Sequence, residues 1–479
     1  MSNPEKLDRN NVEDILALTP MQKGMLLHYL MEPESEQYFE QACYNLTGRI
    51  HPEKIKNAWE YVVKTNEILR TVLRWQGLAE PVQVVLKNHQ VPFFEHDFSG
   101  CNCEERLDMV DRVMKNDRNV RVDISRQPFR IILCKLSENE YQMILSNHHI
   151  ILDGWSNGII LKEFVAAYES LYTGNEPYIS AKNRYREYVK WLQKQDRDIQ
   201  KQFWSNYLKG FSDWKPFKAA VEKQSKAYGI SRYEQELSRE LVECITVFIR
   251  EKGLTLATLF YCAWGILLHK YKGIHDVLFG TTVSGRPVDI KGIQDMVGIF
   301  INTVPLRMGI DPSEEVYKLL NKINSELATR EDFENTPLVD VLSYSGLRNK
   351  DSLFDTVVVI QNYPMDERLF QSDRPINISL HKRFYVTRIE LALGVRVFDR
   401  VILDFTYNTC LFNEESIRKM SEHFVKILEA MIGGTRGNSI LIKDIQVVDE
   451  EEKKQMLLRI KQNNEDLKLI EEVDFDEIF

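Results

Sequence analysis

Strand-like and helix-like segments alternate along the whole chain, and this alternation limits the fold more than any other feature. Residues 129–136 (FRIILCKL) and 141–149 (YQMILSNHH) are typical of two strands joined by a polar turn at 137–140. After Gly154, apolar residues recur at helical spacing, and Gly174 marks the predicted end of that helix. The pattern predicts a fold of the α/β or α+β class.

The same patterns predict a second lobe that begins near Tyr233. Charged and aromatic residues fill the stretch 178–214, where we expect helices that connect the two lobes. The further elements that we expect are helices within 54–75, 257–273 and 413–431, and strands within 81–86, 276–287, 297–308, 356–363 and 400–408.

Length, composition and charge exclude several classes of protein. A chain of 479 residues suggests two or three domains. The net charge of −9 argues against a nucleic-acid-binding protein. No apolar run approaches the ~18 residues that cross a bilayer, and the polar N-terminus does not resemble a signal peptide. We therefore expect a cytoplasmic protein without nucleic-acid or membrane partners. Its seven cysteines are irregularly spaced, which predicts reduced and mostly buried thiols.

Two adjacent histidines stand out, because the chain has only ten. His148 and His149 end a predicted strand, so their side chains should point to opposite faces. They cannot easily share one metal ion, and no third ligand lies at a suitable offset, so we expect no metal site. A neutral imidazole at a strand end can act as a base. Asp153 lies too far along an extended strand to reach His149, and is better placed to hold the loop by pairing with a distant cation.

Glycine and serine follow these residues. Gly154 permits a turn and a close backbone approach, and Ser156 is a candidate cap for the following helix. A buried pair of structural histidines remains the alternative to a catalytic site when the histidines are considered alone. The additional Asp-Gly-Trp-Ser at a fixed offset favours the catalytic interpretation.

The stretch HHIILDGWS (148–156) resembles the HHxxxDG signature of the condensation domains of nonribosomal peptide synthetases, which chloramphenicol acetyltransferase shares more loosely. Companion motifs follow in the order of that family. They are LTPMQKGMLLH (18–28), NEILRTVLRW (66–75), NRYREYVKWL (183–192), VSGRP (283–287), MVGIFINTVPLR (296–307), REDFENTPLVDV (330–341) and DSLFDTVVVIQNYP (351–364). The resemblance covers roughly residues 12–450.

The resemblance implies a fold and a reaction. Condensation domains consist of two chloramphenicol acetyltransferase-like lobes arranged in a V, with an active-site tunnel between them. An upstream and a downstream peptidyl carrier protein deliver their substrates on phosphopantetheine arms. The downstream aminoacyl amine attacks the upstream acyl or peptidyl thioester, and a peptide bond forms. The domain itself binds no cofactor, and we expect a monomer that works with other synthetase subunits or domains.

Individual roles follow from the same resemblance. His149 is implied to be the active-site residue, as a general base or as a group that orients the amine. The supporting residues are implied to be His148, Asp153, Gly154, Trp155 and Arg286. His148 would face inward and hold the loop, and Asp153 would pair with Arg286. The backbone N–H of Gly154 would meet the tetrahedral oxyanion.

Two details refine this picture. The opening motif resembles the subtype that accepts a donor ending in a D-residue. Arg388–Leu391 (RIEL) departs from the Tyr-Asp-Leu of many members, which puts in doubt the packing of the crossover between the lobes. Alternative functions are an epimerisation-type enzyme, a coenzyme A-dependent acyltransferase, or an inactive module that recruits a partner.

The expected organisation has four parts: a docking-like segment (1–15), an N-terminal lobe (16–177), a C-terminal lobe with bridging helices (178–450), and a linker with an acidic tail (451–479). Residues 4–18 resemble a short docking helix. Residues 465–479 hold seven acids and one lysine among spaced apolar residues. Like charges resist compaction, but the apolar residues predict a docking segment or a tail that packs back onto the domain. We expect a free-standing or terminal domain.

Overall fold

The computed structural model describes residues 6–178, 180–212, 215–217, 229–286, 288–347, 352–361, 374–385, 389–397, 400–434, 440–448 and 454, without the side chain of Cys103. The chain divides into two compact units. Unit 1 comprises Met1–Asp196, Ser284–Ile301 and Tyr363–Arg388, and unit 2 comprises the remainder. This division differs from the expected single boundary at 177/178, because two later segments of the chain join the first unit. The expected V and tunnel stay predictions.

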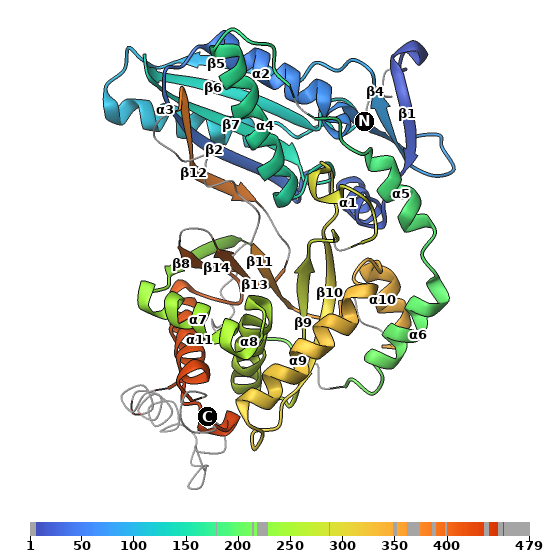
Figure 1. Cartoon of the computed structure of the whole chain (residues 1–479), viewed down its shortest axis with the longest axis vertical. Coiled ribbons are helices and arrows are strands. Elements are labelled where there is room, and N and C mark those ends of the chain that lie inside the picture. Colours follow the sequence, from blue (N-terminus) through green and yellow to red (C-terminus); the bar gives the residue numbers. More distant parts are fainter. Residues whose placement is uncertain are drawn as a thin grey trace. The chain divides into compact units, whose positions relative to one another are not determined.

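Unit 1 contains most of the N-terminal elements (Figure 1). They are η1 (Arg9–Asn11), β1 (Val12–Ala17), α1 (Pro20–Met31), β2 (Phe39–Gly48), α2 (Pro52–Thr65), η2 (Glu67–Arg70), β3 (Thr71–Arg74), β4 (Val82–Leu86), β5 (Phe93–Asp97), α3 (Cys103–Arg118), β6 (Phe129–Ser137), β7 (Glu140–His148), α4 (Gly154–Tyr172), α5 (Tyr185–Gln193), η3 (Ile293–Asp295) and β12 (Ile376–Tyr385).

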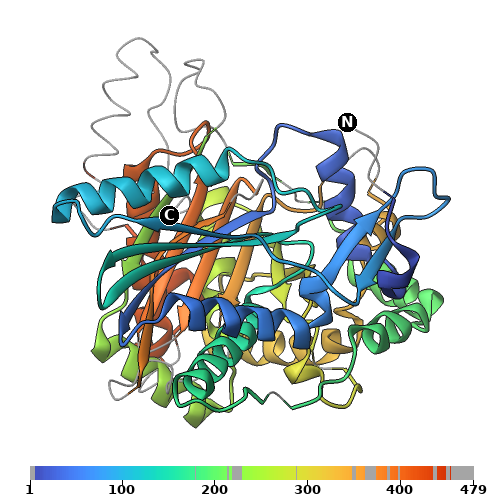
Figure 2. The ribbon, with the colours of Figure 1, turned by 90° about the horizontal axis from the view of Figure 1, so that it is seen from above.

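A five-stranded sheet with the order β12-β2-β7-β6-β5 forms the centre of unit 1. Helix α3 covers one face through the cluster that contains Cys43, Ile132 and Ile144, and α2 and α4 cover the other (Figure 2). Alternate residues of a strand point to opposite faces, so a strand between two helical layers is apolar on both. A separate three-stranded sheet has the order β1-β4-β3.

Strand β12 reaches this sheet from a distant part of the sequence. It pairs antiparallel with β2, with Tyr385 opposite Glu40 and Arg383 opposite Ala42. In Figure 1 the orange arrow of β12 lies beside the blue strand β2. The sheet that carries the histidines is therefore completed by residues more than two hundred positions downstream of β7.

Unit 2 contains the remaining elements. They are α6 (Arg197–Tyr207), β8 (Ile230–Glu236), α7 (Arg239–Lys252), α8 (Leu256–Lys272), β9 (Asp276–Val283), β10 (Asn302–Gly309), α9 (Val316–Arg330), η4 (Glu331–Phe333), α10 (Leu338–Tyr344), β11 (Thr356–Gln361), β13 (Leu391–Val397), β14 (Val401–Asn408), α11 (Glu414–Gly434) and η6 (Ile442–Asp444). Its six strands form one sheet with the order β10-β9-β11-β13-β14-β8.

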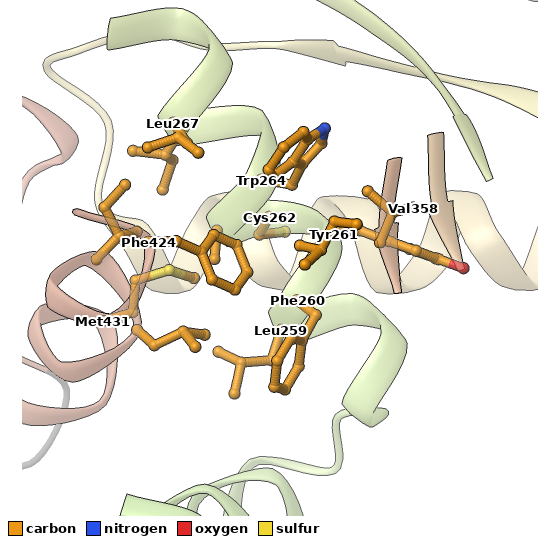
Figure 3. Packing of buried hydrophobic residues seen from close by; sticks show 14 of the residues in the cluster. Leu259, Phe260, Tyr261, Cys262, Trp264, Leu267, Val358, Phe424 and Met431 are labelled. Atoms are coloured by element: carbon orange, nitrogen blue, oxygen red, sulfur yellow. The ribbon is translucent and has the colours of Figure 1, made fainter. Parts of the chain in front are cut away.

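The core of unit 2 is built around α8, which is apolar on all sides and buried. Trp264 packs near Phe424 of α11 and Phe405 of β14, with ring centroids 6.0 and 6.3 Å apart. Figure 3 shows how Phe260, Trp264 and Phe424 gather with aliphatic side chains from α8, α11 and β11. This packing accounts for the strongly apolar stretch 257–273.

Most predicted elements are present, with shifted ends. The helix expected within 54–75 ends at Thr65, and Thr71 already begins strand β3. Residues 12–17 form strand β1, where a docking helix was expected, because their backbone pairs antiparallel with β4. The acidic tail 465–479 lies outside the described residues. Within the described part of the chain, no helix is both long enough and apolar enough to cross a membrane.

Replacing Trp59 with alanine should destabilise unit 1. The Trp59 side chain is buried and stacks on Phe164 of α4 with ring centroids 4.8 Å apart. Removing a buried aromatic side chain costs about 3–5 kcal/mol, so urea denaturation should show a loss of that order. The matched replacement Tyr178→Ala removes a side chain that is 83% exposed and should change the free energy of unfolding little. Equal losses of unfolding free energy in the two variants would contradict the position of Trp59 in the core of unit 1.

Candidate functional site

The loop between β7 and α4 carries the histidines and the aspartate. Strand β7 ends at His148, and α4 begins at Gly154 with Asp153 as its N-cap. The Asp153 carboxylate accepts a hydrogen bond from the Ser156 N–H at 2.8 Å. Asp153, and not the expected Ser156, therefore caps this helix, because an N-cap side chain serves the N–H groups two or three positions ahead.

His149 is partly exposed, and the contacts of its two ring nitrogens differ. Nδ1 lies at hydrogen-bond distance from the carbonyl oxygen of Leu152. A carbonyl oxygen only accepts, so Nδ1 must carry the hydrogen atom. Nε2 of the neutral ring is therefore left with a free lone pair, and it lies 3.8 Å from the carboxylate of Glu40. The geometry gives His149 the tautomer of a base that acts through Nε2.

The backbone N–H of His149 is hydrogen-bonded to a residue in a strained backbone conformation. Its N–H donates to the carbonyl oxygen of Tyr38 at 2.8 Å. Among the described residues, Tyr38 is the only residue other than glycine with a positive φ, which is 64°. Such a conformation costs on the order of 1–3 kcal/mol and persists where the surroundings enforce it. Its position next to His149 is typical of a functional site.

His148 has a different environment from His149. Its side chain is buried against Tyr29 and Tyr38, with ring centroids 5.5 and 6.0 Å away. Burial, followed by the charges of His149 and Arg121, lowers the pKa of His148 to about 3. Its Nδ1 accepts a hydrogen bond from the Ile150 N–H at 3.1 Å. His148 is thus a neutral ring that supports the turn.

Asp153 and Arg286 lie together in the interior of unit 1. The Asp153 Oδ1 atom is 3.6 Å from the Arg286 Nη2 atom, and the side chains are 0% and 1% exposed. Asp153 Oδ2 accepts from the N–H of Phe300 at 2.9 Å. Burial lowers the pKa of Arg286, although the carboxylate of Asp153 opposes this effect. The expected pair is present, and it joins the HHxxxDG loop to segment 284–301.

Further contacts hold Arg286 in place. Its guanidinium donates to the carbonyl oxygens of Ile293 and Met296 at 2.6 and 3.0 Å, and to the hydroxyl of Ser156 at 3.0 Å. The guanidinium carbon lies 4.1 Å from the ring centroid of Phe300. A buried cation needs such partners to offset its lost hydration. Ser156 also bonds both backbone groups of Gly298, so this serine links two segments.

Two glycines allow segment 284–301 to approach closely. Gly285 has φ +64°, and a Cβ atom there would lie 1.9 Å from the carbonyl oxygen of Phe300. A Cβ atom on Gly298 would lie 2.4 Å from the ring of Tyr185. Both positions therefore exclude larger side chains. The Tyr185 hydroxyl donates to the carbonyl oxygen of Ile299 at 2.6 Å, which brings the 183–192 motif to the same place.

The remaining expected residues lie at the start of α4. Trp155 is half-buried, and its indole N–H donates to the carbonyl oxygen of Gln294 at 3.1 Å. Gly154 occupies the first helical position without a positive φ. Within the described part of the chain, the Gly154 N–H has no hydrogen-bond partner. Such N–H groups at a helix N-terminus attract negative charge.

Glu40 was missed by sequence reasoning. This residue lies on β2, far from every quoted motif, and its carboxylate contacts His149 and Arg383 of β12. The sequence could have indicated Glu40 only if the pairing of β12 with β2 had been predicted. The alternation of side chains along the two strands would then have placed Glu40 near Arg383. In the described residues, no three His, Cys, Asp or Glu side chains gather in a way that could hold a metal ion.

Replacing Asp153 with alanine should destabilise the protein strongly. The variant leaves Arg286 buried without its carboxylate and removes the cap of α4, a change that costs about 3–5 kcal/mol. Differential scanning calorimetry should record a lower Tm, and amide-bond formation should fall with it. Glu60→Ala, on the exposed face of α2, is the control and should melt like the wild type. A wild-type Tm for Asp153→Ala would contradict the role of the pair.

The buried neutral His148 should make stability depend on pH. Its pKa is about 3 in the folded chain, whereas a histidine in an unfolded chain titrates near 6.5. Below pH ~6.5 the unfolded state therefore takes up a proton that the folded state does not, and stability falls as pH falls. Between pH 7 and pH 5, the free energy of unfolding of His148→Phe should fall by roughly 2 kcal/mol less than that of the wild type. Equal losses in urea denaturation would contradict this prediction.

Comparisons with known proteins identify the family of the chain. A family model described as the condensation domain matches residues 12–457. Tyrocidine synthase 2 of Brevibacillus parabrevis is 30% identical over 456 residues, which are 94% of this chain and 13% of that protein. Bacitracin synthase 1 of Bacillus licheniformis is 31% identical over 463 residues, which are 95% of this chain and 9% of that protein. The chain thus spans only a small part of these relatives.

Solved structures confirm the mixed α/β fold. A mutant of the starter condensation domain of rhizomide synthetase, in a complex with C8-CoA, has a TM-score of 0.75 at 18% identity over 90% of this chain and 97% of that chain. A four-domain nonribosomal peptide synthetase has a TM-score of 0.77 at 17% identity over 94% of this chain and 35% of that chain. The chain belongs to the condensation-domain family of nonribosomal peptide synthetases, whose members are acyltransferases that form amide bonds.

Proposed function

We propose that this chain forms a peptide bond between two carrier-bound substrates. The donor is an acyl or peptidyl thioester on an upstream peptidyl carrier protein, and the acceptor is the amine of an aminoacyl group on a downstream one. Both would be tethered through phosphopantetheine arms, so the domain needs no cofactor of its own. The observation that carries this proposal is the contact between Nδ1 of His149 and the Leu152 carbonyl oxygen, which leaves Nε2 free.

His149 acts as the base in this reaction. The acceptor amine attacks the thioester carbonyl carbon, a C–N bond forms, and the nitrogen gives up a proton to Nε2 of His149. The tetrahedral intermediate then collapses, the C–S bond breaks, and the departing thiolate takes up a proton. Because both substrates are tethered, positioning supplies much of the acceleration, and His149 adds the proton transfer.

Gly154 stabilises the negative charge of the intermediate. Its N–H stands at the N-terminus of α4 and, among the described residues, has no hydrogen-bond partner. A backbone donor in a fixed position is well suited to an oxyanion, since it needs no reorganisation during the reaction. His148, Asp153, Trp155 and Arg286 act by holding the loop in place.

The donor is expected to end in a D-residue, because residues 18–28 resemble the opening motif of that subtype. A coenzyme A thioester is the second candidate donor, since the similar starter domain of rhizomide synthetase was solved with C8-CoA. Supplying the same acyl group on a carrier protein and on coenzyme A separates the two candidates. Pairs of D- and L-donors, analysed by mass spectrometry of the intact carriers, test the stereochemistry.

Other members of the superfamily remain as alternatives with distinct outcomes. An epimerisation-type enzyme would invert the stereocentre of a carrier-bound residue without transferring it. An inactive recruitment module would bind carriers and form no product. We infer that the domain works in the cytoplasm as a monomer, with other synthetase domains or subunits as partners.

Replacing His149 with alanine should abolish most of the activity. The loss should be ~10²-fold or more in kcat, as expected for a positioned base. Circular dichroism and the Tm should stay close to wild type, because the ring is partly exposed. His96→Ala, an exposed histidine of β5, is the matched control and should keep full activity. Near-wild-type turnover by His149→Ala with the native carrier-bound substrates would refute the general-base role.

A further inference from the structure

Glu40 is a buried carboxylate beside the reactive nitrogen of His149. It lies on β2 directly opposite Asn147 of β7, and opposed residues point to the same face of a sheet. The Glu40 side chain is 10% exposed, and its Oε1 atom is 3.8 Å from Nε2 of His149. The nitrogen that the tautomer leaves free is therefore the one that faces the carboxylate.

Arg383 explains how the buried side chain of Glu40 can carry a negative charge. Its Nη2 atom lies 3.3 Å from the same Oε1 atom of Glu40. Burial by itself raises the pKa of Glu40, but the charges of His149 and Arg383 outweigh it, so the pKa lies below its usual range. Arg383 is charged whatever the state of His149, so Glu40 keeps a cation beside it throughout the proposed reaction.

The distance matters as much as the charge. At 3.8 Å the carboxylate does not accept a hydrogen bond from the ring, so it does not occupy the lone pair of Nε2. It is nevertheless close enough to stabilise a positive charge on the imidazole ring, more strongly than it would in water. This arrangement favours the state that a base reaches after it has accepted a proton.

We propose that Glu40 is a positioning residue that acts through His149, by orienting its ring and stabilising the imidazolium formed during amide-bond formation. This inference rests on the proposed function. In the reaction the proton moves from the amine nitrogen to Nε2 as the C–N bond forms, and from Nε2 to the thiolate as the C–S bond breaks. Glu40 exchanges no proton and contributes only its fixed negative charge.

A purely structural role for Glu40 is the competing explanation, and unit 1 contains a matched control for it. Glu163 of α4 is 11% exposed at the side chain and pairs with Lys182, while also accepting from Asn66 at 2.7 Å. It is thus as buried as Glu40 and also paired with a cation, but among the contacts of the described residues it has none with His149. Glu163→Gln measures what the loss of a buried carboxylate costs the fold.

The test is a double-mutant cycle with carrier-bound substrates. Wild type, Glu40→Gln, Glu163→Gln, His149→Ala and the double variant Glu40→Gln/His149→Ala are compared in kcat, KM and Tm. Glutamine keeps an acceptor for Arg383 and removes the charge. We expect Glu40→Gln to lose about 10- to 100-fold in kcat with little change in KM, and Glu163→Gln to keep its activity. The double variant should be no slower than His149→Ala alone, because Glu40 acts only through that ring.

The outcomes separate this inference from the proposed function. If the wild type forms no amide bond, the proposed function and the role of Glu40 fall together. If His149→Ala is fully active, the base role of His149 and with it the role of Glu40 are overturned, while peptide-bond formation stands. If His149→Ala is impaired while Glu40→Gln has wild-type kcat, only the role of Glu40 is overturned. Independent losses that multiply in the double variant would also overturn it, since they indicate a structural role. Should Glu40→Gln fail to fold, Glu40→Asp replaces it in the same cycle. Its shorter side chain moves the charge away from Nε2, so kcat should still fall, and a wild-type kcat would overturn the role of Glu40.

Discussion

The ion pair between Asp153 and Arg286 is the interaction on which the site depends. Two opposite charges buried together give up their hydration, and the hydrogen bonds of each to backbone or side-chain groups of unit 1 offset that loss. Removing one partner would leave a charge that nothing else can neutralise. The pair therefore fixes where the HHxxxDG loop and segment 284–301 meet.

The rest of the site follows from that fixed point. With Asp153 held at the start of α4, the chain between His148 and Gly154 must turn tightly. The turn brings the Leu152 carbonyl to Nδ1 of His149, and this contact sets the tautomer of the ring. Through this turn, a buried acidic residue sets which ring nitrogen of His149 is left free. The positive φ of Tyr38 adds a second constraint from the opposite side of the loop.

The sequence predicted those parts of the molecule that depend on local patterns. The hairpin β6–β7, helix α4 and the buried helix α8 follow from residue spacing alone, and the partner of Asp153 followed from family resemblance. The sequence did not predict strand β12 or the position of Glu40, because both depend on a pairing between residues about 340 positions apart. Helix and strand preferences act over a few neighbours, whereas such pairing depends on the whole fold. The cap of α4 was assigned to Ser156 because serine and aspartate are both good caps and only the geometry distinguishes them.

The late arrival of β12 has a consequence for how the protein is made. During synthesis β2 emerges early, but its outer edge has no partner until the ribosome has passed residue 385. An unpaired strand edge presents free N–H and C=O groups that can pair with another nascent chain. Contacts between residues so far apart in sequence also form slowly. The sheet that carries the histidines, with Arg383 beside Glu40, can therefore be completed only late in synthesis. Chaperones that shield this edge should raise the yield of folded protein.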